Sequence, residues 1–195
     1  MARFPRRART LALLALAAAC GCASVDGPGA AREVDQPRVA RVSLFSYPWV
    51  WTDEQGQSVT FAQWRGQPLV VSAVFTTCKA TCPRTIAKLE ELDAAFRREG
   101  RTVQFLLVTL DPNNDTPQVL RAFKKSSGLP GEWRFLTGEE HQTRELIEAL
   151  DIHTLDDGPH LLHEGRIVIF DGNGMPTRTY GGWGLGHMTT LAGGG

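Results

Sequence analysis

The sequence predicts an α/β domain with a mixed central sheet flanked by helices and a β-hairpin at its N-terminal end. Strand-like apolar runs alternate with segments whose apolar residues recur at helical spacing, and a hairpin signal closes the series. A chain of 195 residues is long enough for one domain with a core but short for two. We therefore expect one domain at 42–195, after a signal peptide at 1–19 and a flexible tether at 20–41.

The first elements are predicted from β-propensity and continuous hydrophobicity. The run 42–52 is rich in aromatic and β-branched residues, a turn signal follows at 53–56, and 58–61 can return as a second strand. Residues 69–75 form a nearly continuous apolar run, which is typical of a strand buried on both faces. These segments predict the hairpin and the first central strand.

Helical periodicity alternates with further strands along the rest of the chain. Apolar residues at helical spacing over 86–96 predict a helix whose first turn holds Cys82 and Pro83 and which Gly100 closes. The following elements are predicted in order: a strand at 102–109, a loop at 111–117, a helix at 117–126, a strand at 132–136, a helix capped by Thr137 with Leu146, Ile147 and Leu150 buried, and strands at 166–170 and 176–180 around the turn 171–174.

The charge balance bears on the class of partner. Lys plus Arg and Asp plus Glu both number 21, so the chain has no net positive charge with which to neutralise nucleic-acid phosphates. We do not expect nucleic acid to be a partner.

The first residues have the pattern of an export signal. Several arginines precede the apolar run Leu11–Ala19, which is shorter than the about 20 apolar residues that span a bilayer. Small residues lead to Cys20, which resembles the lipid-attachment site of bacterial lipoproteins, with Cys22 as the alternative. A plain secretory signal and an uncleaved anchor remain open. Each alternative exports the domain, and we expect it on the periplasmic side of a bacterial membrane, tethered there by a lipid or an N-terminal anchor.

The pair Cys78-x3-Cys82 is the first candidate for chemistry. Cysteines at a helix start gain thiolate character, because free backbone N–H groups and the helix dipole stabilise negative charge there. A thiolate is the nucleophile of disulfide exchange and also a ligand for soft metals. A structural disulfide closing so small a loop would contribute little stability. The spacing therefore leaves redox exchange and metal binding open.

A third ligand would narrow the choice of metal. The candidates are His141, His153, His160, His163 and His187. His163 precedes the apolar run 167–170 and is expected on the loop that enters this strand, although a histidine there can equally be a solvated polar residue.

The loop 111–117 is a further candidate, because it follows a buried strand at the edge where α/β proteins build their sites. Asp115 or Thr116 can instead cap the next helix.

Three stretches together resemble the SCO/SenC family of thioredoxin-like proteins, which carry copper to the binuclear copper centre of cytochrome c oxidase. They are 75–83 with its Cys-x3-Cys-Pro motif, 108–117, and His163 eleven residues before Gly174. The resemblance implies a thioredoxin-like fold and binding of Cu(I) or Cu(II) by Cys78, Cys82 and His163, with His160 as the alternative histidine.

The same resemblance gives the acidic loop a supporting role, through Asp111 or Asp115, and implies a copper-bearing oxidase subunit or another copper chaperone as partner.

The chain departs from the family pattern at three positions. Lys79 stands where proline often follows the first cysteine, Leu162 where aspartate often precedes the histidine, and Glu164 where serine or threonine often follows it.

Two functions follow from these residues, and a copper metallochaperone is the first. The alternative is an extracytoplasmic thiol-disulfide oxidoreductase with Cys78 and Cys82 as its catalytic redox pair, so enzymatic activity stays open. A peroxidase on the related peroxiredoxin plan ranks last, because Thr76 and Thr77 lie too close to Cys78 for its motif.

Overall fold

The computed structural model describes residues 32–33, 42–156 and 161–183. The predicted signal peptide, both lipidation candidates, His160 and His187 lie outside these residues. The strands are β1 (Arg32–Glu33), β2 (Trp51–Asp53), β3 (Ser58–Val59), β4 (Leu69–Val74), β5 (Gln104–Thr109), β6 (Arg134–Thr137), β7 (Thr154–Asp156), β8 (Leu161–His163), β9 (Gly165–Phe170) and β10 (Pro176–Trp183). The helices are α1 (Thr81–Arg98), α2 (Pro117–Ser126) and α3 (Glu140–Ala149), and two 3-10 turns are η1 (Leu44–Ser46) and η2 (Phe61–Trp64).

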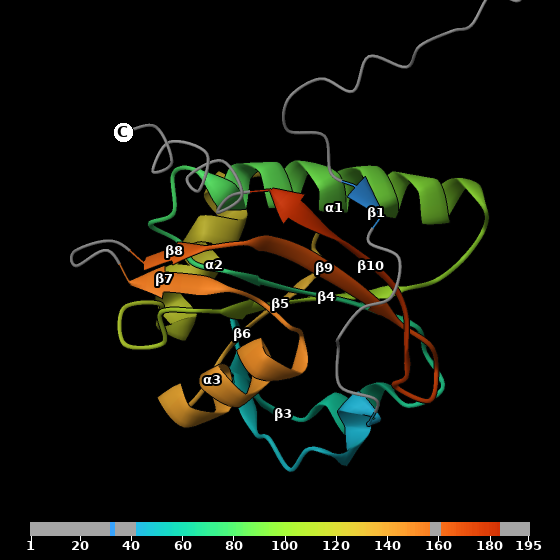
Figure 1. The fold of residues 1–195 in the computed structure, drawn as a ribbon, viewed down its shortest axis with the longest axis horizontal. Coiled ribbons are helices and arrows are strands. Elements are labelled where there is room, and N and C mark those ends of the chain that lie inside the picture. Colours follow the sequence, from blue (N-terminus) through green and yellow to red (C-terminus); the bar gives the residue numbers. More distant parts are fainter. Residues whose placement is uncertain (1–31, 34–41, 157–160, 184–195) are drawn as a thin grey trace, which may run out of the picture.

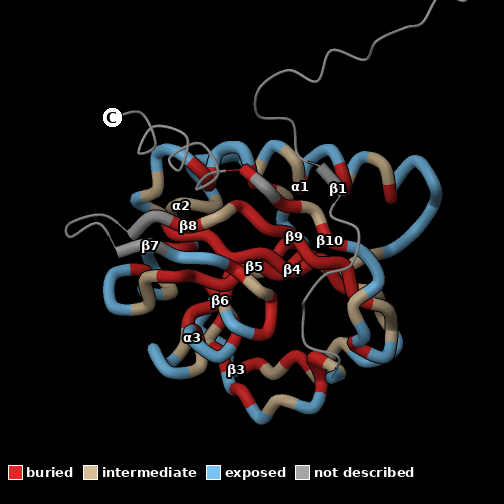
Figure 2. The backbone as a smooth tube through the Cα atoms, in the orientation of Figure 1, coloured by how far each residue is buried: buried red, intermediate tan, exposed pale blue. Residues whose placement is uncertain are grey.

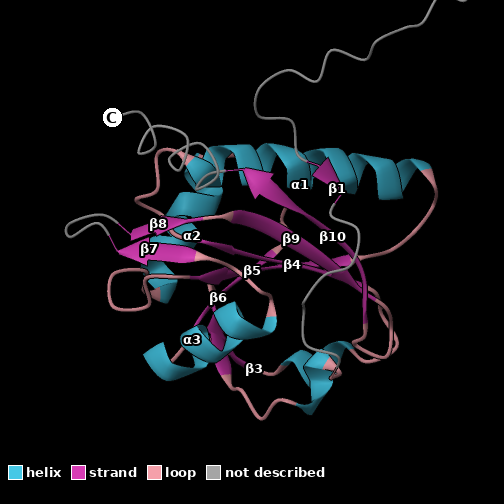
Figure 3. Ribbon diagram, viewed as in Figure 1, coloured by secondary structure: helices cyan, strands magenta, loops and turns pink. Residues whose placement is uncertain are grey.

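One mixed sheet forms the centre of the domain, in the order β1-β10-β9-β4-β5-β6-β2-β3. Strands β4, β5 and β6 are parallel neighbours, whereas β9 runs antiparallel to β4, and β10 antiparallel to β9. Helices α1 and α3 lie on opposite sides of this sheet, as Figures 1 and 3 show. The predicted α/β class with a mixed, helix-flanked sheet is confirmed.

The core is built around the central strands. All six residues of β4 and all six of β9 are buried, which agrees with a continuous apolar run covered on both faces. Figure 2 shows buried backbone concentrated in the centre of the sheet and exposed backbone along the outer side of α1. This rigid centre fixes the strand ends from which the candidate site residues extend.

Two predicted helices match the structure closely. Helix α1 places Cys82 and Pro83 in its first turn, and α2 spans Pro117–Ser126 with Thr116 as its N-cap, whose hydroxyl accepts a bond from the Val119 amide. The first-turn proline suits both helices, because its missing N–H would have no intrahelical partner there.

The predicted front hairpin is much shorter than expected. Only β2 and β3 pair, with Trp51 opposite Val59, while Leu44–Ser46 is a 3-10 turn and Phe61 begins another. The aromatic run fills the core instead of extending a strand: Trp49 and Trp51 are buried and pack edge-to-face. Side-chain burial therefore dominates over the β-propensity of this segment.

The predicted cap of α3 was wrong. Thr137 is the last residue of β6, where it pairs with Thr52, and it lies two residues before the N-cap of α3. Glu139 takes the N-cap position and makes no capping hydrogen bond with its side chain.

A further hairpin, which the sequence did not predict, precedes β9. Strands β7 and β8 pair with each other as a separate two-stranded sheet, with Thr154 opposite His163. His163 thus ends a short strand, not the loop that was predicted, and Glu164 alone separates it from β9. Within the described ranges, no helix is long and apolar enough to cross a bilayer.

Candidate metal centre

The two cysteines lie where β4 passes into α1. Cys82 is the second residue of α1 and is buried, whereas Cys78 lies in the preceding loop and is partly exposed. The Cys82 amide donates to Cys78 Sγ at 3.3 Å, and the Phe75 amide donates to Cys82 Sγ at 3.5 Å. Both cysteines are free, and each sulfur accepts a backbone bond, Cys78 from the start of α1 and Cys82 from the residue after β4.

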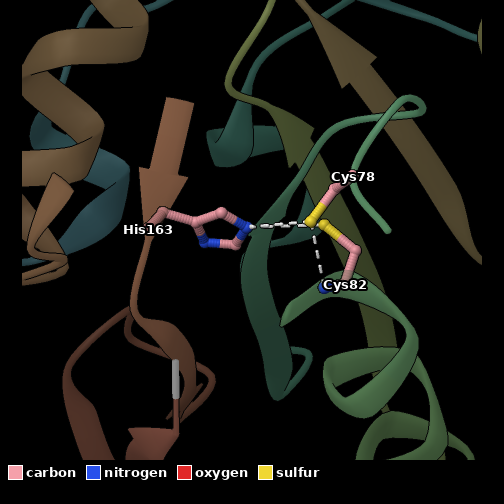
Figure 4. Close-up of side chains that lie close together, drawn as sticks. All are labelled: Cys78, Cys82 and His163. Atoms are coloured by element: carbon pink, nitrogen blue, oxygen red, sulfur yellow. Dashed lines mark hydrogen bonds between the residues drawn. The ribbon is translucent and has the colours of Figure 1, made fainter. Parts of the chain in front are cut away.

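His163 faces this pair from the end of β8. Its Nε2 lies 3.4 Å from Cys82 Sγ and 3.8 Å from Cys78 Sγ, and its side chain points at the two sulfurs in Figure 4. Its Nδ1 lies 3.0 Å from the carbonyl oxygen of Glu164. Because a carbonyl only accepts, Nδ1 carries the proton and the Nε2 lone pair faces the sulfurs.

The surroundings hold the imidazole in place. His163 is 1 % exposed, and the Phe75 ring lies 5.5 Å from it, centroid to centroid. The Thr81 hydroxyl donates to the His163 carbonyl at 3.2 Å, which ties β8 to the start of α1. The three predicted ligands, from two distant parts of the chain, thus face one another.

The donor set suits a soft metal ion. One ligand atom each from Cys78, Cys82 and His163 lies within 4.8 Å of the other two. Two thiolates and an imidazole form a three-coordinate set that fits Cu(I) or Zn(II), and the imidazole also suits Cu(II). His141 and His153 are exposed and lie outside this cluster.

The two thiols differ in acidity. A hydrogen bond from Cys82 lowers the pKa of Cys78 well below its usual range, burial opposes this shift, and bonds from two backbone amides add to it. The same bond to Cys78, together with burial, raises the pKa of Cys82. In the metal-free protein Cys78 is therefore the thiolate and Cys82 the thiol.

The two aspartates of the acidic loop differ in their contacts. Asp115 is 1 % exposed, and its carboxylate accepts bonds from the Thr76 amide at 3.1 Å and from the Thr76 and Thr109 hydroxyls. It thus joins the end of β5 to the loop that carries Cys78. Asp111 bonds the Asn114 side chain and no member of the cysteine-histidine cluster. Asp115 is neither a cap of α2 nor part of this cluster.

The comparison with protein families agrees with this geometry. The SCO1/SenC family model matches residues 38–184, which is most of the chain. The chain belongs to the SCO1/SenC family. The family resemblance that was inferred from the cysteine, aspartate and histidine motifs is confirmed.

The relatives of this SCO1/SenC protein are distant in sequence. The SCO1 protein homolog of Bacillus subtilis is 23% identical over 140 residues, which cover 69% of this chain and 72% of the relative. Copper-bound ScoI of Bradyrhizobium japonicum has a TM-score of 0.58 at 22% identity, covering 67% of this chain and 85% of that one. BsSco, a Sco-family member described with a disulfide switch, has a TM-score of 0.62 at 22% identity, with 73% and 86% covered. The solved structures support the thioredoxin-like fold.

One group of residues beside the SCO1/SenC site was missed in the sequence. Glu164 and Arg166 form an ion pair directly after His163, and Asp151 and His153 join them from the segment after α3. The only sequence signal was a pair of opposite charges at the start of an apolar strand, which does not reveal its partners.

We predict that iodoacetamide modifies Cys78 at a rate nearly independent of pH between about 6 and 8, because its thiolate is already formed throughout that range. An ordinary thiol would gain about tenfold in rate per pH unit below its pKa of about 8.5. Peptide mass spectrometry of the metal-free protein measures the rate. A tenfold rise per unit at Cys78 would contradict this prediction.

Replacing Asp115 should destabilise the domain. Asp115→Ala leaves the Thr76 amide and two hydroxyls without their acceptor, and an unsatisfied buried group costs about 1–3 kcal/mol. Urea denaturation measures the free energy of unfolding. Asp111→Ala is the control and should change it by less than about 0.5 kcal/mol, as is usual for surface substitutions. Equal losses in the two variants would argue against this role of Asp115.

Proposed function

We propose that this protein is a metallochaperone that binds copper through Cys78, Cys82 and His163. The observation that carries the proposal is the convergence of the two sulfurs and Nε2 within 4.8 Å. A copper-bound ScoI among the structural neighbours supports the choice of metal. Thiolates favour Cu(I), while the imidazole allows Cu(II) to bind as well.

The arrangement suits a site that must release its cargo. Cys82 and His163 are buried, whereas Cys78 is partly exposed at the protein surface. An incoming ligand from a partner can therefore reach the metal from the Cys78 side and replace the protein ligands one after another. Three protein ligands leave a position at which such a ligand can enter.

We infer that the recipient is the binuclear copper centre of cytochrome c oxidase during assembly, directly or through another copper chaperone. Membership of the SCO1/SenC family supports this inference, as does BsSco, described as a member of a family of cytochrome c oxidase assembly proteins. Incubation of the copper-loaded protein with a soluble copper-bearing oxidase domain tests it. Copper that stays on this protein while the acceptor remains empty would refute direct delivery.

We also propose export to the periplasmic side of the membrane, with lipid attachment at Cys20 and with Cys22 as the alternative. The basic start, the short apolar run and the small residues before Cys20 support it. The mass of the mature N-terminal peptide identifies the modified cysteine, and a mature N-terminus without lipid would contradict the proposal.

The His163→Ala variant tests the three-ligand copper site. We expect its copper affinity to fall by more than the 10–100-fold that loss of a ligand's hydrogen-bonding partner typically costs, because a ligand itself is removed. Competition titrations with Cu(I) and Cu(II), with absorption and EPR spectra, measure the change. His141→Ala is the matched control, because His141 is exposed and lies outside the cluster. Unchanged affinity and spectra in His163→Ala would rule out the three-ligand site.

A thiol-disulfide oxidoreductase is the second candidate, favoured by the acidity of Cys78 and by its closeness to Cys82. The Cys78 thiolate would attack a substrate disulfide, form a mixed disulfide and release one substrate thiolate. Cys82 would then lose its proton and attack Cys78 Sγ, which releases the second substrate thiolate and leaves an oxidised Cys78–Cys82 pair. A dithiol reductant must return the pair to the reduced state. This scheme needs no histidine ligand, so exchange on a disulfide substrate that survives in His163→Ala would support it.

A further inference from the structure

The hairpin that carries His163 has little support of its own. Strands β7 and β8 are three residues each and form no ladder with the main sheet. An isolated two-stranded hairpin is at best marginally stable in water. The position of His163 at the end of β8 therefore depends on contacts between this hairpin and the rest of the domain.

The orientation of the His163 ring depends directly on the backbone of Glu164. The Nδ1–H group donates to the Glu164 carbonyl at 3.0 Å, and this bond turns Nε2 toward the sulfurs. A rotation of the peptide after Glu164 would remove that acceptor. The direction of the ring therefore depends on the contacts that hold Glu164 in place.

Glu164 is held at both its backbone and its side chain. Its amide donates to the His153 carbonyl at 2.8 Å, and its carboxylate lies 2.9 Å from His153 Nδ1. The same carboxylate accepts two bonds from one Nη of Arg166, at 3.2 and 3.3 Å. Because the His153 side chain is largely exposed, the buried Arg166 is a firmer partner than His153.

Arg166 in turn is attached to two other parts of the fold, one through its side chain and one through its backbone. Its other Nη lies 3.1 Å from Asp151 Oδ2, in the turn after α3, and its carbonyl accepts a bond from the Ser72 hydroxyl of β4 at 2.7 Å. Arg166 is 6 % exposed. A buried cation between two carboxylates is costly to remove, because both carboxylates lose a positively charged partner.

We infer that Arg166 is a positioning residue for His163, acting through the Glu164 carboxylate and carbonyl. The inference rests on the proposed copper site for its functional meaning, but the geometry that it concerns belongs to the metal-free protein. The guanidinium ties Glu164 to Asp151 in the turn after α3, and the Glu164 carbonyl then selects the tautomer and direction of the imidazole. Such partners of a histidine ligand commonly set its orientation and basicity.

The test compares Arg166→Met with Lys124→Met. Lys124 makes a similar buried ion pair elsewhere in the domain, with Nζ 2.8 Å from Glu54 Oε1, so its loss should also lower stability. Nitrogen-15 NMR of the metal-free proteins reports the His163 tautomer. We expect a single Nδ1–H form in the wild type and in Lys124→Met, and a mixture of tautomers in Arg166→Met.

Copper affinity provides the second measurement. Arg166→Met should lose about 10–100-fold, the usual cost of removing a ligand's supporting partner, whereas Lys124→Met should stay near the wild-type value. Arg166→Lys should lose less copper affinity than Arg166→Met, because the ammonium keeps the positive charge. It should not reach the wild-type affinity, because an ammonium cannot bond both carboxylates as the planar guanidinium does.

Glu164→Gln tests the positioning role of Arg166 if Arg166→Met does not fold. This variant keeps the backbone carbonyl that accepts from His163 but loses the ion pair with Arg166. We expect mixed tautomers and an intermediate loss of affinity. A single Nδ1–H tautomer with unchanged affinity in the folded Arg166→Met or Glu164→Gln variant would overturn the inference. If the wild type bound no copper, the proposed function would fail, and the NMR comparison alone would still decide the role of Arg166.

Discussion

The antiparallel pairing of β4 with β9 is the constraint on which the site depends. Ser72 lies opposite Ile167 and Leu69 opposite Phe170. The C-terminal end of β4 and the N-terminal end of β9 therefore lie side by side. The chain enters the cysteine loop from one strand and leaves His163 toward the other. A register fixed by two fully buried strands thus brings together side chains that are 81 and 85 residues apart.

Much of the fold could be predicted because its elements carry local signals. The apolar run of β4, the helical spacing in α1 and the proline start of α2 each reflect burial or backbone chemistry within a few residues. The segment around Trp49 misled the prediction, since its aromatic side chains suit a strand but pack here around a 3-10 turn and a short hairpin. The local signal does not include the contact that Trp49 makes with α3, where its Nε1 donates to the Glu145 carboxylate.

The residues of the candidate site also differ in how far the sequence could predict them. Cys78 and Cys82 were predictable because two cysteines at a helix start have few other uses. The choice of His163 came from a family resemblance, since β8 is too short to leave a signal of its own. Arg166 was beyond prediction, because its importance lies in side-chain contacts with Glu164 and Asp151 that only the folded chain creates. The carboxylate of Glu164 supplies one of the two anionic partners of Arg166.

The short strand β1 has a consequence for where this site can operate. Arg32 and Glu33 lie within the segment predicted to be a tether, yet they pair with Gly181 and Tyr180 of β10 at the edge of the sheet. A lipid on Cys20 would be only twelve residues from Arg32, and a fully extended chain of that length reaches about 40 Å. The length of the tether is then counted from Arg32 at the sheet edge and not from residue 42. A tether of that length would keep the domain within a shallow layer above the bilayer. A copper acceptor would have to present its site within that layer.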